Sequence, residues 1–300
     1  MLCRTAQRAP KLRVGRARAG RPACGGAHED KGRAGNGLPL GCPELAARES
    51  RGRVSLLQRL VRTLLTLAAV LPGIATGLLV LLLRRDRRAA MNRAIGTWGR
   101  LGLRAAGIRL EVRGAAHLEM ARPCVFLLNH QSGVDPILTC ALLRRDFVGV
   151  AKRELRRNPL LGPAFAFAGT VFVDRLDHEQ AVRSLSPAVE RLRAGLSIAI
   201  APEGTRGQGG ALGPFKKGGF RLAMQAGVPI VPVVILNSQD VLPGGSWLMR
   251  PGCVSVVVHP AIDTQGWALP DLDAQVARVH DLYRATLAAG PGASPPSLQD

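Results

Sequence analysis

The chain has 300 residues, of which 41 are Lys or Arg and 21 are Asp or Glu, so its net charge is +20. A charge of this size calls for an anionic partner, which can be nucleic acid, a phospholipid surface or a phosphorylated substrate. Only 4% of the residues are aromatic, which argues against a nucleic-acid site made of stacked aromatic side chains.

Residues 1–53 form a basic leader, rich in Arg, Ala, Gly and Pro, that shows neither a helical nor an alternating apolar period. Residues 1–62 carry 14 basic and four acidic side chains, a surplus of ten that is half of the total. We predict that the leader is disordered. Two alternatives stay open: an organelle transit peptide, against which the four acidic residues count, and a translation start further downstream.

Residues 54–104 are expected to anchor the protein in a membrane. Residues 63–83 are a run of 21 residues without a charge, long enough as a helix to cover about 31 Å and so the hydrocarbon layer of a bilayer. Pro72 and Gly73 lie at its midpoint, where they could kink a spanning helix or turn it back as a hairpin within one leaflet. Arginines flank both ends, which favours a re-entrant hairpin at one anionic surface. The alternative is a helix buried in the protein core.

Residues 105–289 are predicted to form one α/β domain, a single mostly parallel sheet flanked by helices, followed by a flexible tail over residues 290–300. Several of the apolar runs are hydrophobic throughout, as expected for strands that are covered on both faces. The expected strands cover residues 108–112, 125–128, 147–150, 170–173, 196–201, 230–236 and 254–258. Helices are expected over residues 177–192, with Asp177 as N-cap, and over residues 272–288.

The segment 125–136 runs from a buried strand into Asn129 and His130, and then into Asp135 and Pro136. His130 therefore lies at the carboxyl end of a strand, where open α/β sheets place their ligand crevices. Asp135 before Pro136 is also a good helix start. On these residues alone, Asp135 could simply cap a helix and His130 could be a core histidine.

Further polar residues follow other predicted strands. Glu203, Gly204, Thr205 and Arg206 come directly after the strand over 196–201, and Arg175 follows the strand over 170–173. The glycine permits close backbone approach, the threonine offers a hydroxyl, and the guanidinium groups suit a phosphate. The prolines of the segment 228–235 are expected to restrict it to an edge or a bent strand.

Together these four segments, in this order, closely resemble the glycerolipid acyltransferase family, which includes the 1-acylglycerol-3-phosphate O-acyltransferases. The first family motif is met by Asn129, His130 and Asp135, and the third by residues 203–206. Gly169, Phe172 and Arg175 fit the second motif, and Pro229 and Pro232 fit the fourth. Ala201 and Gly207 depart from the residues that often flank the third motif, which bears on the shape of the pocket and not on its charges.

The resemblance implies that His130 is the general base that takes the proton of an acceptor hydroxyl and that Asp135 orients it. Arg206, Arg175 and Lys152 are expected to form a cationic pocket for the acceptor phosphate. Glu203 and Thr205 would orient the glycerol or the arginine. A hydrolase with Ser132 as nucleophile is disfavoured because the chain has no G-x-S-x-G turn.

The implied activity transfers a fatty acyl group from acyl-CoA or acyl-carrier protein to 1-acylglycerol-3-phosphate, giving phosphatidic acid in phospholipid biosynthesis. Expected partners are lysophosphatidic acid or a related lysolipid, the acyl donor and an anionic membrane surface, without nucleic acid. The expected location is the bacterial inner membrane, with the site on its cytoplasmic side. An enzyme for another lysolipid, such as lyso-ornithine lipid or a lysophospholipid, is the main alternative, and a basic nucleic-acid-binding protein is another.

The six cysteines include no C-x-x-C pair and have no histidine near them at zinc-ligand spacing. We therefore predict no metal, no cofactor beyond the acyl donor as co-substrate, and no disulfide framework.

Overall fold

The computed structural model describes residues 54–157, 162–173, 186–207 and 211–291. Its centre is a seven-stranded sheet in the order β1-β7-β6-β2-β5-β3-β4. Neighbouring strands pair in parallel except β6 and β7, which are antiparallel. The predicted α/β fold with one mostly parallel sheet is therefore confirmed. The leader over residues 1–53 and residues 292–300 of the expected tail lie outside the described residues.

All seven predicted strands are present, with ends that shift by at most two residues. They are β1 Ile108–Arg113, β2 Val125–Leu128, β3 Phe147–Lys152, β4 Val171–Val173, β5 Ser197–Ile200, β6 Ile230–Ile235 and β7 Gly252–Val258. β2, β5 and β6 are buried along their whole length, because helices cover both faces of the sheet.

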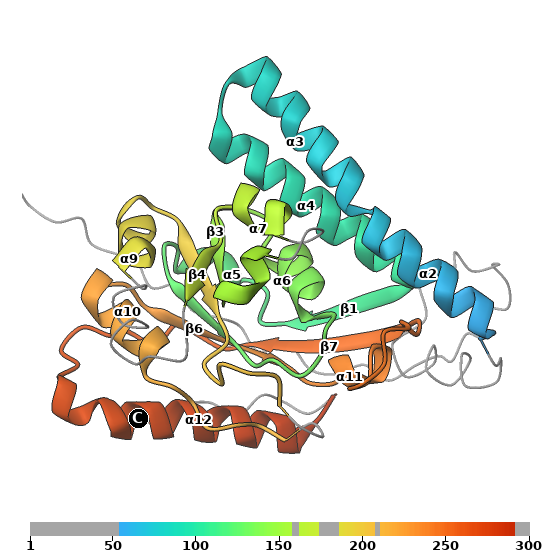
Figure 1. Ribbon diagram of the computed structural model, residues 1–300. Helices are drawn as coiled ribbons and strands as arrows, with labels where there is room; N and C mark the ends of the chain where they lie inside the picture. Colours follow the sequence, from blue (N-terminus) through green and yellow to red (C-terminus); the bar gives the residue numbers. More distant parts are fainter. Residues whose placement is uncertain (1–53, 158–161, 174–185, 208–210, 292–300) are drawn as a thin grey trace, which may run out of the picture. The chain divides into compact units, whose positions relative to one another are not determined.

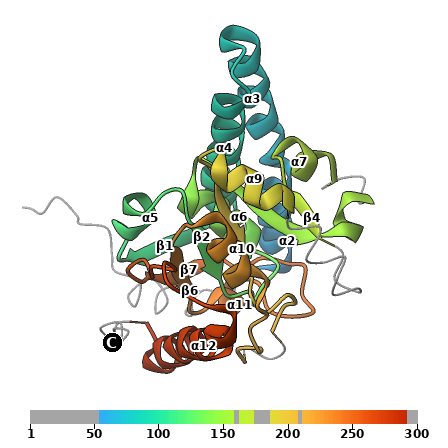
Figure 2. The same ribbon diagram turned by 90° about the vertical axis from the view of Figure 1, so that its left-hand side faces the viewer.

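The helices form two layers around the sheet. They are α2 Leu56–Ala68, α3 Val70–Arg84, α4 Arg87–Ala106, α5 His117–Met120, α6 Asp135–Leu143, η1 Arg153–Arg157, α7 Gly162–Phe167, α9 Ser186–Arg193, α10 Gly218–Ala226, α11 Ser238–Val241, η2 Leu269–Asp271 and α12 Leu272–Ala289. Phe126 and Leu128 of β2 pack in one core with α4 and α6, whereas Val125 and Leu127 pack in the other with α9, α10 and α12. Figure 1 and Figure 2 show α4 and α12 on opposite sides of the sheet.

The two helices predicted in this domain are present where they can be described. The expected helix over residues 272–288 is α12, which begins at Leu272 and ends at Ala289. Of the expected helix over residues 177–192, α9 begins at Ser186, and the predicted N-cap Asp177 lies outside the described residues.

Of the two placements expected for the proline-containing strand, an edge or a bent strand, the edge was wrong, because β6 lies between β7 and β2. Pro232 is opposite Leu127 of β2 and comes one residue before the Val233–Val258 pair that ends the β7 ladder. Its carbonyl accepts the N–H of His259 at 3.0 Å. Because β7 has already ended at this level, the N–H that proline lacks is not needed for the ladder.

The N-terminal helices form a hairpin, but its turn is not at Pro72. α2 and α3 follow one another as a helical stretch of 29 residues that is long and apolar enough to cross a membrane. The chain turns at Arg85 and Asp86, and α4 runs back along α3 (Figure 1). Pro72 lies in the first turn of α3, where a missing N–H costs little.

Two glycines of α3 allow its close approach to α4. A Cβ atom on Gly73 would lie 2.9 Å from the carbonyl oxygen of Ala94, and one on Gly77 would lie 2.9 Å from the Ala94 Cβ. Gly73 and Gly77 are four residues apart, so they share one face of the helix. The apolar segment that the sequence suggested as a membrane anchor is thus one half of a tightly packed helical pair.

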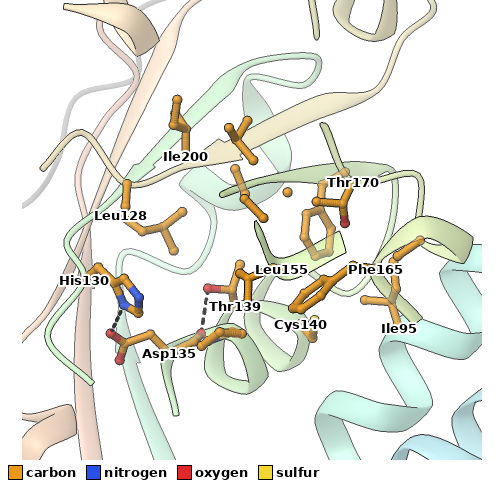
Figure 3. Close-up of a pocket in the computed structure, with 18 of the residues that line it drawn as sticks. Ile95, Leu128, His130, Asp135, Thr139, Cys140, Leu155, Phe165, Thr170 and Ile200 are labelled. Carbon is orange, nitrogen blue, oxygen red and sulfur yellow. Dashed lines mark hydrogen bonds and ion pairs between the residues drawn. The ribbon is translucent and has the colours of Figure 1, made fainter. Parts of the chain in front are cut away.

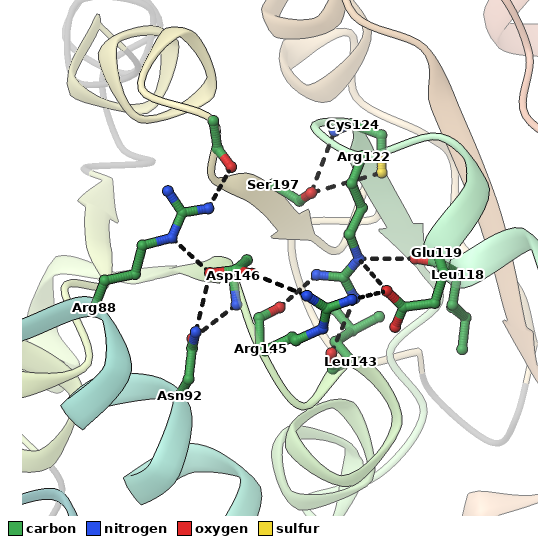
Figure 4. A network of polar contacts seen from close by, with 11 residues as sticks. Arg88, Asn92, Leu118, Glu119, Arg122, Cys124, Leu143, Arg145, Asp146 and Ser197 are labelled. Atoms are coloured by element: carbon green, nitrogen blue, oxygen red, sulfur yellow. Dashed lines mark hydrogen bonds and ion pairs between the residues drawn. The ribbon is translucent and has the colours of Figure 1, made fainter. Parts of the chain in front are cut away.

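Asp146, just before β3, fastens α4 to the sheet domain (Figure 4). Its carboxylate accepts hydrogen bonds from Arg88 Nε at 2.6 Å and Asn92 Nδ2 at 3.0 Å, and its own N–H donates to Asn92 Oδ1 at 2.8 Å. Burial disfavours the charged form of Asp146, but the hydrogen bonds from Asn92 and Arg88 outweigh it and hold its pKa below the usual value. These contacts fix the orientation of α4, and with it the helical hairpin, relative to the sheet.

The cysteine prediction was wrong for Cys253, which is disulfide-bonded, although Cys124 and Cys140 are free and buried. The spacing of cysteines along a chain does not report which of them meet in space. Within the described residues, no group of three or more metal-ligating side chains comes together.

Candidate active site

His130 and Asp135 meet at the carboxyl end of β2 (Figure 3). His130 Nδ1 lies 2.7 Å from Asp135 Oδ2. Asp135 is only 4% exposed, whereas the His130 side chain is 29% exposed. A carboxylate at Nδ1 favours the tautomer with its proton on that nitrogen, so Nε2 is left as the proton acceptor.

The local sequence explains why this pair is rigid. Asp135 Oδ2 also accepts the backbone N–H groups of Gln131 and Ser132, each at 2.8 Å. The carboxylate therefore closes the turn between β2 and α6. α6 begins at Asp135 itself, so this residue is not the N-cap that the sequence suggested, and its side chain binds the preceding turn.

Asn129 holds the end of β2 in place. Its side-chain Nδ2 donates to the carbonyl of Ile235 at 2.8 Å, and its Oδ1 accepts the Ile235 N–H at 2.7 Å. The residue is 1% exposed. Asn129 therefore joins the ends of β2 and β6, and it also lines the cavity beside His130.

Ser132 is occupied in the same turn. Its hydroxyl donates to the carbonyl of Leu242 at 2.7 Å, and the residue is 2% exposed. A buried hydroxyl bound to a backbone carbonyl is poorly suited to attack a substrate, which agrees with the argument against a serine hydrolase.

The third motif follows β5, which pairs in parallel with β2. Gly204, Thr205 and Arg206 line the same cavity as His130 and Asp135. Thr205 and Arg206 are exposed. Gly204 has φ +75, a conformation that favours glycine, and the Lys216 side chain would lie 3.0 Å from a Cβ atom placed there.

Glu203 of the same motif points elsewhere. Its side chain is 5% exposed, and its oxygens accept the backbone N–H of His130 at 2.9 Å and of Gly213 at 3.0 Å. Among the described residues, no ion pair joins it to Arg206. Burial raises the pKa of Glu203, although the two N–H groups act in the opposite direction.

The other two predicted site residues are Lys152 and Arg175. Lys152 ends β3, is exposed, and lines the cavity together with Arg206. Arg175 lies outside the described residues. β2, β5 and β3 are adjacent and parallel, so His130, Arg206 and Lys152 lie along one edge of the sheet, where the carboxyl ends of parallel strands meet.

A cavity of about 530 Å³ extends from His130 into the interior of the molecule (Figure 3). Beyond the polar groups at the sheet edge, its walls are mainly apolar. They include Phe147 and Val150 of β3, Phe165 of α7 and Cys140 of α6. The far wall comes from the hairpin, through Val70 and Ile74 of α3 and Ala94, Ile95 and Trp98 of α4.

Sequence reasoning did not find this contribution of the hairpin. The segment 63–83 showed only that it was apolar, and nothing in that pattern distinguishes a residue facing lipid from one facing a cavity. The spacing of Gly73 and Gly77 could have indicated a close helix partner, but the lining residues depend on how the pair packs on the sheet.

A histidine held by a buried carboxylate, at the polar end of a long apolar cavity, is the arrangement expected of an enzyme that handles acyl chains. Comparison with known proteins agrees. The family model described as Acyltransferase matches residues 109–236. The chain is 38% identical over 214 residues to 1-acyl-sn-glycerol-3-phosphate acyltransferase beta of Homo sapiens, covering 71% of this chain and 77% of the human protein.

Two further relatives extend this similarity. The chain is 34% identical over 184 residues to the 1-acyl-sn-glycerol-3-phosphate acyltransferase of Limnanthes alba, covering 61% of this chain and 65%, or just under two thirds, of that protein. The crystal structure of the 1-acyl-sn-glycerophosphate (LPA) acyltransferase PlsC from Thermotoga maritima superposes with a TM-score of 0.61 at 26% identity. That superposition covers 78% of this chain and 96% of PlsC. The chain belongs to the acyltransferase family.

Proposed function

We propose that this protein transfers a fatty acyl group from a thioester donor to the free hydroxyl of 1-acylglycerol-3-phosphate, giving phosphatidic acid. The observation that carries the proposal is the His130–Asp135 pair, joined at 2.7 Å, at the mouth of the apolar cavity. The relatives named above carry the same activity in their names.

In the proposed reaction, His130 Nε2 takes the proton of the acceptor hydroxyl while its oxygen attacks the thioester carbonyl. The tetrahedral intermediate then collapses, the carbon–sulfur bond breaks, and the leaving thiolate recovers the proton from the imidazolium. Asp135 keeps the imidazole in the required tautomer and stabilises its positive charge in between. No metal or further cofactor takes part in this scheme.

The cavity is proposed to hold an acyl chain. Its volume of about 530 Å³ is within the usual range for ligand sites. Apolar walls stabilise a hydrocarbon chain by removing it from water. The reacting carbonyl would then lie beside His130, at the end of the cavity that Asp135 and Arg206 also line.

The cationic side of the site is proposed to bind the acceptor phosphate. Arg206 and Lys152 line the cavity and are exposed, and among the described residues neither has an ion-pair partner that would occupy it. A guanidinium binds phosphate through two parallel hydrogen bonds. We include Arg175 in this group, on the ground that it follows the neighbouring strand β4 in the sequence.

The hairpin is proposed to anchor the enzyme in an anionic membrane. The exposed apolar side chains of α2 and α3 include Leu57, Leu64, Leu71, Leu79 and Leu82. A helix with such a face is stable beside lipid and costly in water. The net charge of +20 would favour the anionic cytoplasmic leaflet of a bacterial inner membrane, with the active site on that side.

The decisive experiment offers the purified protein a panel of lysolipid acceptors with acyl-CoA and with acyl-carrier protein thioesters. We expect 1-acylglycerol-3-phosphate to give the highest kcat/KM. A higher value for lyso-ornithine lipid or for a lysophospholipid with a larger head group would assign the chain to that acceptor. The absence of acyl transfer to every lysolipid would reject the proposal.

A further inference from the structure

Glu203 differs from the residues that follow it in the third motif. Gly204, Thr205 and Arg206 line the cavity, whereas Glu203 is not among the described residues that do. Its side chain is 5% exposed. A carboxylate removed from the cavity in this way is poorly placed to touch a substrate, so its role must be sought in the contacts that it makes.

The sheet register brings Glu203 next to His130. β2 and β5 pair in parallel with Leu127 opposite Ile200. His130 comes three residues after Leu127, and Glu203 comes three residues after Ile200. His130 and Glu203 therefore lie next to each other, just beyond the ends of two adjacent strands. Glu203 Oε1 accepts the His130 backbone N–H at 2.9 Å.

Both backbone groups of His130 are held by the segment that contains Glu203. The carbonyl of His130 accepts the N–H of Gly207 at 2.9 Å. The second oxygen of Glu203 accepts the N–H of Gly213 at 3.0 Å, and a Cβ atom at Gly207 or Gly213 would lie 3.4 Å from that oxygen. The carboxylate thus joins three chain segments at the backbone of the catalytic base.

We propose that Glu203 is a positioning residue that fixes His130 through its backbone and does not bind the acceptor. The inference rests on the proposed function insofar as His130 acts as the base. Asp135 sets the orientation of the imidazole ring, and Glu203 sets the position of the main chain from which that ring extends. A shift of the base by about 1 Å is enough to cost roughly 100-fold in rate.

The pKa of Glu203 reflects the same contacts. Burial raises the pKa of Glu203 against the opposing effect of the His130 and Gly213 N–H groups. A carboxyl group whose pKa is raised on folding contributes stability only below its unfolded pKa, and that contribution is lost as the pH rises through the folded pKa. Burial thus disfavours the carboxylate form of Glu203 in the folded protein, and the hydrogen bonds from the His130 and Gly213 N–H groups offset part of that cost.

The test compares Glu203→Gln and Glu203→Asp with the wild-type enzyme. Glutamine keeps the shape but has one acceptor oxygen, and aspartate keeps the charge but is too short to reach both N–H groups. We expect each variant to lower kcat by about 10- to 100-fold with an unchanged acceptor KM. Glu190→Gln, on the exposed surface of α9, is the matched control and should leave both constants unchanged.

A second readout separates this proposal from the choice of acceptor. In protein labelled with ¹⁵N-histidine, the backbone amide signal of His130, assigned by its loss in His130→Gln, should move upfield in Glu203→Gln and stay in place in Glu190→Gln. An unmoved signal would overturn the proposal whatever the enzyme acylates. A raised acceptor KM with normal kcat would also overturn it, in favour of substrate binding. A melting temperature lowered in proportion to the loss of kcat would overturn it in favour of a general structural role.

Discussion

At the scale of single residues, His130 and Asp135 carry the chemistry. His130→Ala removes the general base, and we expect turnover to fall by a factor of about 10² to 10⁴. Asp135→Asn keeps the size of the side chain but cannot stabilise the imidazolium, so turnover should fall as well. The measurement is single-turnover acyl transfer, with circular dichroism to show that the variants are folded. Near-normal turnover of a folded His130→Ala enzyme would refute its assignment as the base.

Arg206 provides a separate prediction at the same scale, because it lines the cavity and no ion pair with the described residues engages it. Arg206→Ala should raise the acceptor KM by roughly 10- to 150-fold, since a charged hydrogen bond contributes about 1.5 to 3 kcal/mol. Arg206→Lys should recover only part of this loss because it lacks the two-pronged guanidinium. The donor KM and the melting temperature are the controls. An unchanged acceptor KM at native stability would point to an acceptor without a phosphate monoester.

At the scale of elements, the contact between α4 and the start of β3 depends on Asp146. Asp146→Asn should lower the free energy of unfolding by about 1 kcal/mol near neutral pH, a small value because Arg88 is half exposed. The pKa of Asp146 is lowered in the folded protein, so its contribution is present above the unfolded pKa and is lost as the pH falls through the folded pKa. Denaturant unfolding at neutral and at acidic pH should therefore show a difference between variant and wild type that shrinks in acid. A difference independent of pH would contradict this ionic role.

At the scale of the whole molecule, the leader and the hairpin should behave differently on deletion. Removing residues 1–53 should leave acyl transfer and membrane association intact, because the leader has no core-forming pattern. Removing residues 54–90 deletes α2, α3 and the start of α4, together with the Val70 and Ile74 wall of the cavity. We expect this second variant to leave the membrane fraction or to aggregate. Loss of folding in the variant that lacks residues 1–53 would contradict this prediction. Loss of membrane association in the same variant would favour a polyanion-binding role for the arginines of the leader.

The sequence alone determined the seven strands and their α/β arrangement, because both follow from short-range pattern, whereas the pairing of His130 with Asp135 was implied only by the family resemblance. An apolar run bounded by turn residues predicts a strand, and adjacent parallel strands present their carboxyl ends at one edge. Tertiary structure alone decided three other features. Pro232 lies in a central strand, at the level where the neighbouring strand β7 ends. The hairpin turns at Arg85 and not at Pro72. The Glu203 side chain binds the backbone of His130. Each of these features depends on which residues lie opposite one another in the sheet or in the helix pair. Such residues are far apart in the sequence, so local sequence patterns do not reveal which of them meet.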